Sequence, residues 1–70
     1  MSPELVAIYA ATNAEVARVL AMQTANMAKM MEAMAKMQGT EPPRLPYDQD
    51  MYLVAACNLD RLSIEARNSR

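Results

Sequence analysis

Residues 3–38 read PELVAIYAATNAEVARVLAMQTANMAKMMEAMAKMQ, with no glycine and no proline after the first position. Apolar residues recur in this stretch at alternating spacings of three and four, which places them on one side of an α-helix. Ser2 stands where it can cap the first turn, and Gly39 stands where a left-handed residue ends a helix. The stretch therefore predicts a single helix, roughly 54 Å long at about 1.5 Å per residue.

Two apolar seams run side by side along this helix. The first carries large side chains interrupted by two amides: Val6, Tyr9, Asn13, Val16, Leu20, Gln23, Met27, Met30, Met34 and Met37. The second consists mainly of alanine: Ala7, Ala10, Ala14, Ala17, Ala21, Thr24, Ala28, Met31 and Ala35. A helix that is apolar around more than half of its circumference has to be surrounded by other helices.

The rest of the chain predicts an antiparallel hairpin. Residues 39–47 form a linker that three prolines hold extended. Asp48 can cap a shorter second helix over about residues 48–67, with an apolar seam at Tyr52, Ala55, Leu59, Leu62 and Ala66. We expect this helix to cover the half of the first helix nearest the linker, about residues 20–37. Residues 5–19 would then have no partner within the chain.

A chain of 70 residues is too small to stabilise this arrangement easily on its own. Cys57 is its only cysteine and it has no histidine, so neither an intrachain disulfide nor a zinc site can help. The positions that flank the large seam carry no charges, although a two-stranded coiled coil uses charges there. These features favour a multi-helix bundle, most simply a homodimer of hairpins.

We assign the oligomer interface to the large seam nearest the N-terminus and its flank: Val6, Tyr9, Asn13, Val16, Val19 and Leu20. Asn13 and Gln23 either fix the register as buried amides or stay hydrated at the edge of the seam. If Asn13 fixes the register, Asn13→Leu should raise the melting temperature and loosen the oligomeric state.

The methionine cluster is assigned to partner binding: Met27, Met30, Met31, Met34 and Met37. Flexible methionine side chains suit a surface that adapts to another protein. Core packing and a thioether site for Cu(I) are the two alternative interpretations. No histidine or second cysteine supports a metal, and we expect neither a metal nor a cofactor.

No catalytic residues are assigned, because histidine, the usual base for serine or cysteine catalysis, is absent. Cys57 is expected to be a buried structural thiol. The net charge of −1 and the lack of a basic stripe argue against nucleic-acid binding. A lone cysteine and the absence of a signal peptide favour the cytoplasm. The apolar run from Leu5 to Ala14 is broken by Glu15 and Arg18, so we expect no membrane span.

The sequence thus predicts a non-enzymatic protein–protein interaction module: a small adaptor, chaperone-like protein or inhibitor. In size and layout the hairpin resembles Rop-type bundle dimers and small secretion chaperones, which implies a four-helix bundle. No sequence motif is shared with either. The alternative functions are a Rop-like nucleic-acid binder with Arg18, Lys29 and Lys36 along one side, a Cu(I) carrier, and a small-ligand binder near Tyr9.

Overall fold

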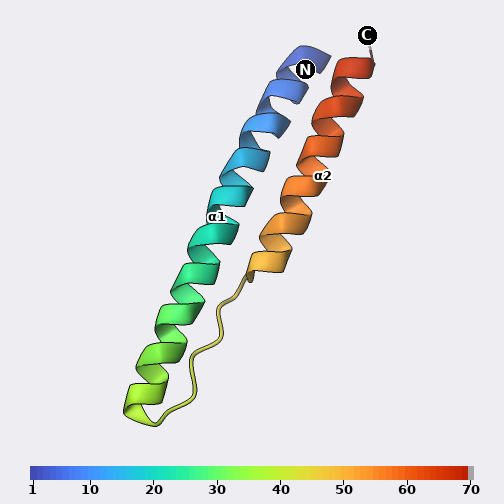
Figure 1. Cartoon of the computed structure of the whole chain (residues 1–70). Helices are drawn as coiled ribbons and strands as arrows, with labels where there is room; N and C mark the ends of the chain where they lie inside the picture. The colour runs from blue at the N-terminus through green and yellow to red at the C-terminus, as the bar shows by residue number, and fades with distance from the viewer. Residues whose placement is uncertain (70) are drawn as a thin grey trace.

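The computed structural model describes residues 1–69 and consists of two helices joined by an extended linker (Figure 1). Helix α1 spans Pro3–Gln38 and helix α2 spans Gln49–Asn68. The two helices pack against each other and run in opposite directions, which confirms the predicted all-α helical hairpin.

The helix ends follow from the capping residues that the sequence indicated. The Ser2 hydroxyl accepts a hydrogen bond from the Leu5 amide at 3.3 Å, and the Asp48 carboxylate accepts one from the Met51 amide at 2.9 Å. Gly39 takes the left-handed conformation with φ of 69°, so its own amide and that of Thr40 can close the last turn of α1. Capping thus sets the ends of α1 and the start of α2.

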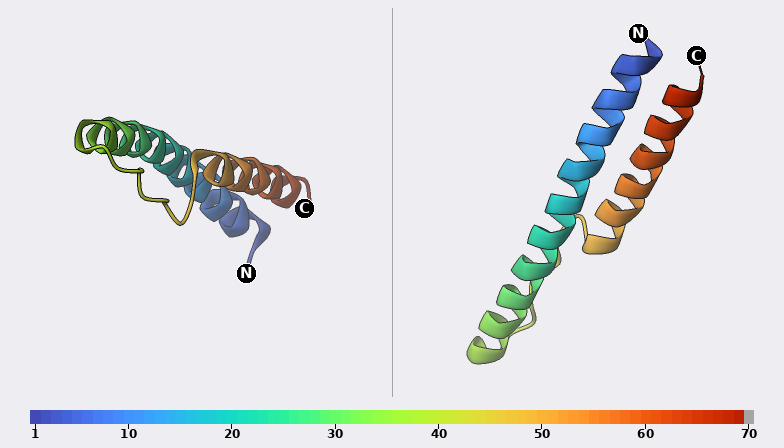
Figure 2. Two further views of the ribbon diagram at one scale, coloured as in Figure 1. Left: turned by 90° about the horizontal axis from the view of Figure 1, so that it is seen from below. Right: turned by 45° about the horizontal axis from the view of Figure 1, so that its top comes forward.

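Helix α2 packs against the N-terminal half of α1, and the expectation that it covers residues 20–37 is wrong. The start of α1 and the end of α2 lie at the same end of the molecule (Figure 1). At that end the Ser63 hydroxyl donates a hydrogen bond to the Ala7 carbonyl oxygen at 2.9 Å. The linker explains the difference, because an extended, proline-rich segment advances about 3.1 Å per residue. It runs back along α1 before α2 begins (Figure 2).

The linker takes the place of α2 over the C-terminal half of α1. Ala35 is buried, and Ala28, Met31 and Leu45 are half-buried. Tyr47 and Tyr52 meet edge to face where the linker joins α2, with ring centroids 6.0 Å apart. The alanine seam is therefore covered along most of its length by α2 and then by the linker.

The hairpin core contains only small side chains. It consists of Ala7, Ala10, Ala14, Ala17, Ala21 and Ala35 of α1 and Ala56, Ser63 and Ala66 of α2. Among residues 1–69 eighteen large apolar side chains are exposed, and not one is fully buried. Packing on alanine lets two helices lie close together, but each methyl group adds only about 0.8 kcal/mol of transfer free energy. The hairpin alone therefore leaves most of its apolar surface uncovered.

The residues of α2 that pack against α1 form a stripe along the helix, which we call the packing stripe. It differs from the predicted seam at two points, and at each of them the packing residue is the next one along the chain. It consists of Tyr52, Ala56, Leu59, Ser63 and Ala66, whereas Ala55 and Leu62 are exposed. The small residues Ala56 and Ser63 fit against the alanine seam, where the larger Leu62 would hold the helices apart. The alanine seam of α1 thus selects the small residues of α2.

Helix α1 is long and apolar enough, by length and composition alone, to cross a membrane. The expectation that no segment spans a membrane therefore stays a prediction. A core helix of a soluble protein and a signal sequence meet the same criterion.

Candidate interaction face

The large seam of α1 remains open after the hairpin forms. Tyr9, Asn13, Val16, Val19 and Leu20 are all exposed, and Val6 is half-buried. The exposure has a different cause from the one that the sequence predicts: α2 lies alongside this half of α1 but packs on the neighbouring alanine seam. We call the open surface the large-residue face: Leu5, Val6, Tyr9, Val16, Val19, Leu20, Met27, Met30, Met34 and Met37.

The methionine cluster divides between this face and the linker. Met27, Met30, Met34 and Met37 are exposed, and Met37 is 88% accessible. Met31 is half-buried and lines a groove beneath the linker. Four of the five methionines therefore lie outside the core of the single hairpin, and whether they pack in the core of an assembly stays a prediction.

An ion-pair network marks the opposite side of the hairpin. One Arg18 nitrogen donates to a Glu15 carboxylate oxygen at 2.6 Å, and another donates to Asp60 of α2 at 2.8 Å. The hydrogen bonds from Glu15 first, and then from Asp60, raise the pKa of Arg18 above its ordinary value. Arg18 therefore keeps its charge at any physiological pH. The sequence offered no signal for its pairing with Asp60.

This network also shows which flank of α2 adjoins the large-residue face. Asp60 shares one helical row with Cys57 and Ile64, so that row lies beside Arg18. The row on the other side of the packing stripe contains Met51, Ala55 and Leu62. That second row continues the large-residue face onto α2, and all three residues are exposed. The hairpin as a whole therefore has one apolar side, which both helices form, and an opposite side that carries the Arg18 ion pairs.

Charged residues of α1 occupy the strip beside Arg18, away from the large-residue face. They are Glu4, Glu15, Arg18, Lys29, Glu32 and Lys36. A face broad enough for two helices and without charges of α1 is suited to packing against another helical surface.

Ser63 holds the two helices in register. Its side chain is 2% accessible, donates to the Ala7 carbonyl and accepts a hydrogen bond from Arg67 at 3.2 Å. Among residues 1–69 no buried side-chain nitrogen or oxygen lacks a partner. Sequence reasoning missed Ser63, although its spacing of seven from Ala56 marks a row of small residues on α2.

Cys57 is exposed, so the expectation of a buried structural thiol is wrong. It lies one position beyond Ala56, outside the packing stripe. One residue turns an α-helix by about 100°, so the side chain that follows Ala56 points away from α1.

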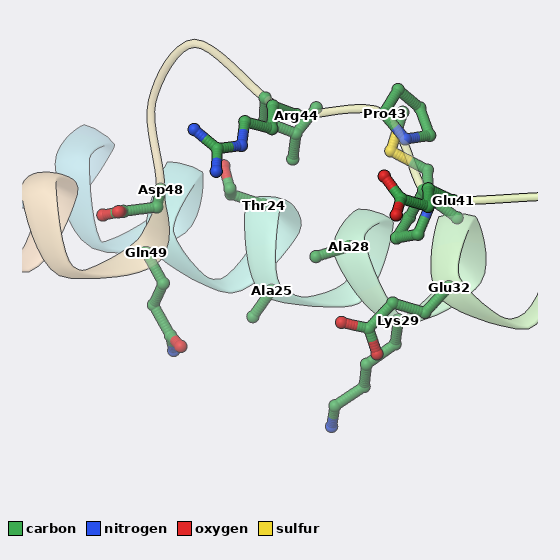
Figure 3. A pocket seen from close by; sticks show the side chains of 13 residues that line it. Thr24, Ala25, Ala28, Lys29, Glu32, Glu41, Pro43, Arg44, Asp48 and Gln49 are labelled. Carbon is green, nitrogen blue, oxygen red and sulfur yellow. The ribbon is translucent and has the colours of Figure 1, made fainter. Parts of the chain in front are cut away.

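A groove lies beneath the linker. Figure 3 shows Glu41, Pro43 and Arg44 of the linker above Thr24 and Ala28 of α1. It is open to solvent, and its charged residues are of both signs: Lys29, Glu32, Glu41, Arg44 and Asp48. Within residues 1–69 no group of three or more His, Cys, Asp or Glu side chains could hold a metal ion. The groove therefore presents no set of groups that selects one ligand.

Comparison of the chain with models of protein families, with characterised proteins and with solved structures gives no match.

Proposed function

We propose that this chain is a non-enzymatic protein–protein interaction module that acts as a homo-oligomeric helical bundle. Two hairpins bring their large-residue faces together to form a homodimer. In this form the protein works as a small cytoplasmic adaptor, chaperone-like protein or inhibitor.

The observation that carries the proposal is the surface of the isolated hairpin. Its accessible surface is 5548 Å² for a chain of 7.8 kDa. A compact monomer of that mass exposes only about 4,400 Å². The excess of roughly 1,100 Å² exceeds the ~800 Å² that each partner buries in an interface of standard size. Dimerisation through one face accounts for an excess of this size.

The dimensions of the hairpin agree with this estimate. Its backbone extends over 57 × 15 × 12 Å, so the broader side covers about 850 Å², close to the ~800 Å² expected per partner. Helices that lie on a membrane surface carry many Lys and Arg residues on the polar side. The polar strip of α1 instead carries both signs of charge, which favours a second helical surface over lipid.

A further protein that binds the exposed methionines takes the place of the second copy, because these methionines lie on the large-residue face. They lie beyond the part of α1 that α2 covers, and flexible thioether side chains adapt to partners of different shape. The nucleic-acid alternative is weaker, because two carboxylates engage Arg18 and leave only Lys29 and Lys36 of the three proposed contacts.

The test compares two valine-to-lysine variants. Val16 is 50% accessible in the hairpin and lies on the large-residue face, whereas Val54 is 60% accessible and lies on the outer side of α2. A symmetric dimer contains each interface residue twice. Removing two half-buried valines from the interface should cost about 1.5–3 kcal/mol. Val16→Lys should therefore weaken the dimer at least tenfold in sedimentation equilibrium.

Val54→Lys is the matched control and should sediment as the unchanged protein does. Equal behaviour of the two variants, whether both dimeric or both monomeric, would remove the large-residue face from the interface. Circular dichroism on both variants should show that helix content is retained.

A further inference from the structure

We propose that the second copy binds with its α1 antiparallel to the first α1, so that the methionine end of each chain covers the Val6–Val16 end of the other. This orientation rests on the homodimer proposed above. It deepens that proposal by naming which residues meet.

The spacing of the large seam permits this arrangement. From Val6 to Met37 the spacings are three and four in strict alternation, beginning and ending with three. The pattern therefore reads the same in both directions, with its midpoint between Leu20 and Gln23. A reversed copy laid on the seam places each of its residues opposite another seam residue, as a two-fold interface requires.

The side chains that then face each other complement one another in size. Val6 faces Met37 of the second copy, Tyr9 faces Met34, and Val16 faces Met27. Each of these three layers combines a shorter or stiffer side chain with a long flexible thioether, and sulfur–aromatic contact adds to the Tyr9 layer. At the midpoint Leu20 faces Gln23. A parallel dimer would place tyrosine on tyrosine and methionine on methionine, so its layers would be uneven in volume.

The length of α2 favours the same orientation. It pairs with only the N-terminal half of α1, and the linker alone lies along the other half (Figure 2). In an antiparallel dimer the exposed methionine end of one chain lies over α1 and α2 of the other, so three helices meet at every level. A parallel dimer would have four helices at one end and two at the other.

The helix dipoles also favour the antiparallel arrangement. Each α1 is 36 residues long, and a parallel pair would bring the like-charged ends of the two helices together. The antiparallel pair places the positive end of one helix beside the negative end of the other.

Electron-spin distance measurement on a single attached label distinguishes the two orientations. The label is attached at Lys36→Cys in a Cys57→Ser background, with Met22→Cys in the same background as the control. Positions 22 and 36 are both exposed, and their separation of two heptads puts them on the same row of α1. Met22 lies next to the proposed two-fold axis. At about 1.5 Å rise per residue, the two Lys36 positions would be about 44 Å apart along the dimer axis.

The antiparallel dimer predicts a distance above about 40 Å for the label at position 36. For the label at position 22 it predicts about 20–24 Å, the width of two adjacent helices. Short distances at both positions would overturn the antiparallel orientation and leave the homodimer intact. Absence of any dipolar coupling at position 22, together with a monomeric sedimentation mass, would overturn both the orientation and the proposed function.

Discussion

Asn13 is the amide whose role depends most on the assembly. It is exposed in the hairpin and lies on the seam between Tyr9 and Val16. In the antiparallel dimer it faces Met30 of the second copy, which supplies no amide to pair with it. A polar group that loses water without gaining a partner costs about 1–3 kcal/mol.

Replacing Asn13 by leucine should therefore stabilise the dimer. We expect Asn13→Leu to raise the melting temperature by at least 4–8 °C, the shift that roughly 1 kcal/mol produces in a domain of this size. Asn68→Leu is the matched control, because Asn68 is exposed and lies two heptads after Val54, on the outer side of α2. It should give only the small gain that leucine brings to any helix. Differential scanning calorimetry measures both.

A register-fixing amide also costs stability, so the oligomeric state distinguishes the two roles: a mixture of oligomers in Asn13→Leu would show that Asn13 pairs with its own copy. That outcome is the register role that a buried amide plays in parallel coiled coils, and it would contradict the antiparallel orientation.

At the scale of the helices, the alanine seam fixes the distance between α1 and α2. Ala14 has no accessible surface, so a larger side chain there has no space to enter. Ala14→Leu should lower the free energy of unfolding by about 1–3 kcal/mol through overpacking. Ala33→Leu makes the same change at an exposed position of α1 and should be tolerated. Urea denaturation of the two variants provides the comparison, and equal midpoints would show that α2 does not pack on the alanine seam.

The helices themselves could be predicted from the sequence because their ends depend on local chemistry. Ser2, Gly39 and Asp48 act on amides and carbonyls within a few residues of themselves, so their capping is visible in the sequence. The position of α2 along α1 could not be predicted in the same way. The position depends on the path of the linker. Three prolines keep the linker extended, but they do not determine the direction in which it runs along α1.

The choice between the two seams also lay beyond the sequence. Either seam offered a continuous apolar surface, and only the small residues Ala56 and Ser63 on α2 indicate which one it packs against. Once α2 takes the alanine seam, the stripe of α2 shifts by one residue in two places. That shift moves Leu62 to the surface. The Arg18–Asp60 pair follows from the same shift and could not be foreseen.

For the whole molecule, the candidate interface could be proposed from the sequence because large apolar residues outnumber the positions that a two-helix hairpin can bury. The six residues assigned to assembly lie together along one side of α1, and five of them are exposed. Their continuation onto α2 through Met51 and Leu62 required the three-dimensional structure. The identity of a further protein partner is not encoded in any motif of the chain.

Sedimentation equilibrium of the unchanged protein over a wide concentration range tests the central claim most directly. The claim is that an alanine-packed hairpin needs a second copy to cover its large side chains. A mass of twice 7.8 kDa, with helix content that falls as the dimer dissociates on dilution, is the predicted result. A fully helical, cooperatively unfolding species of 7.8 kDa at every concentration would contradict it.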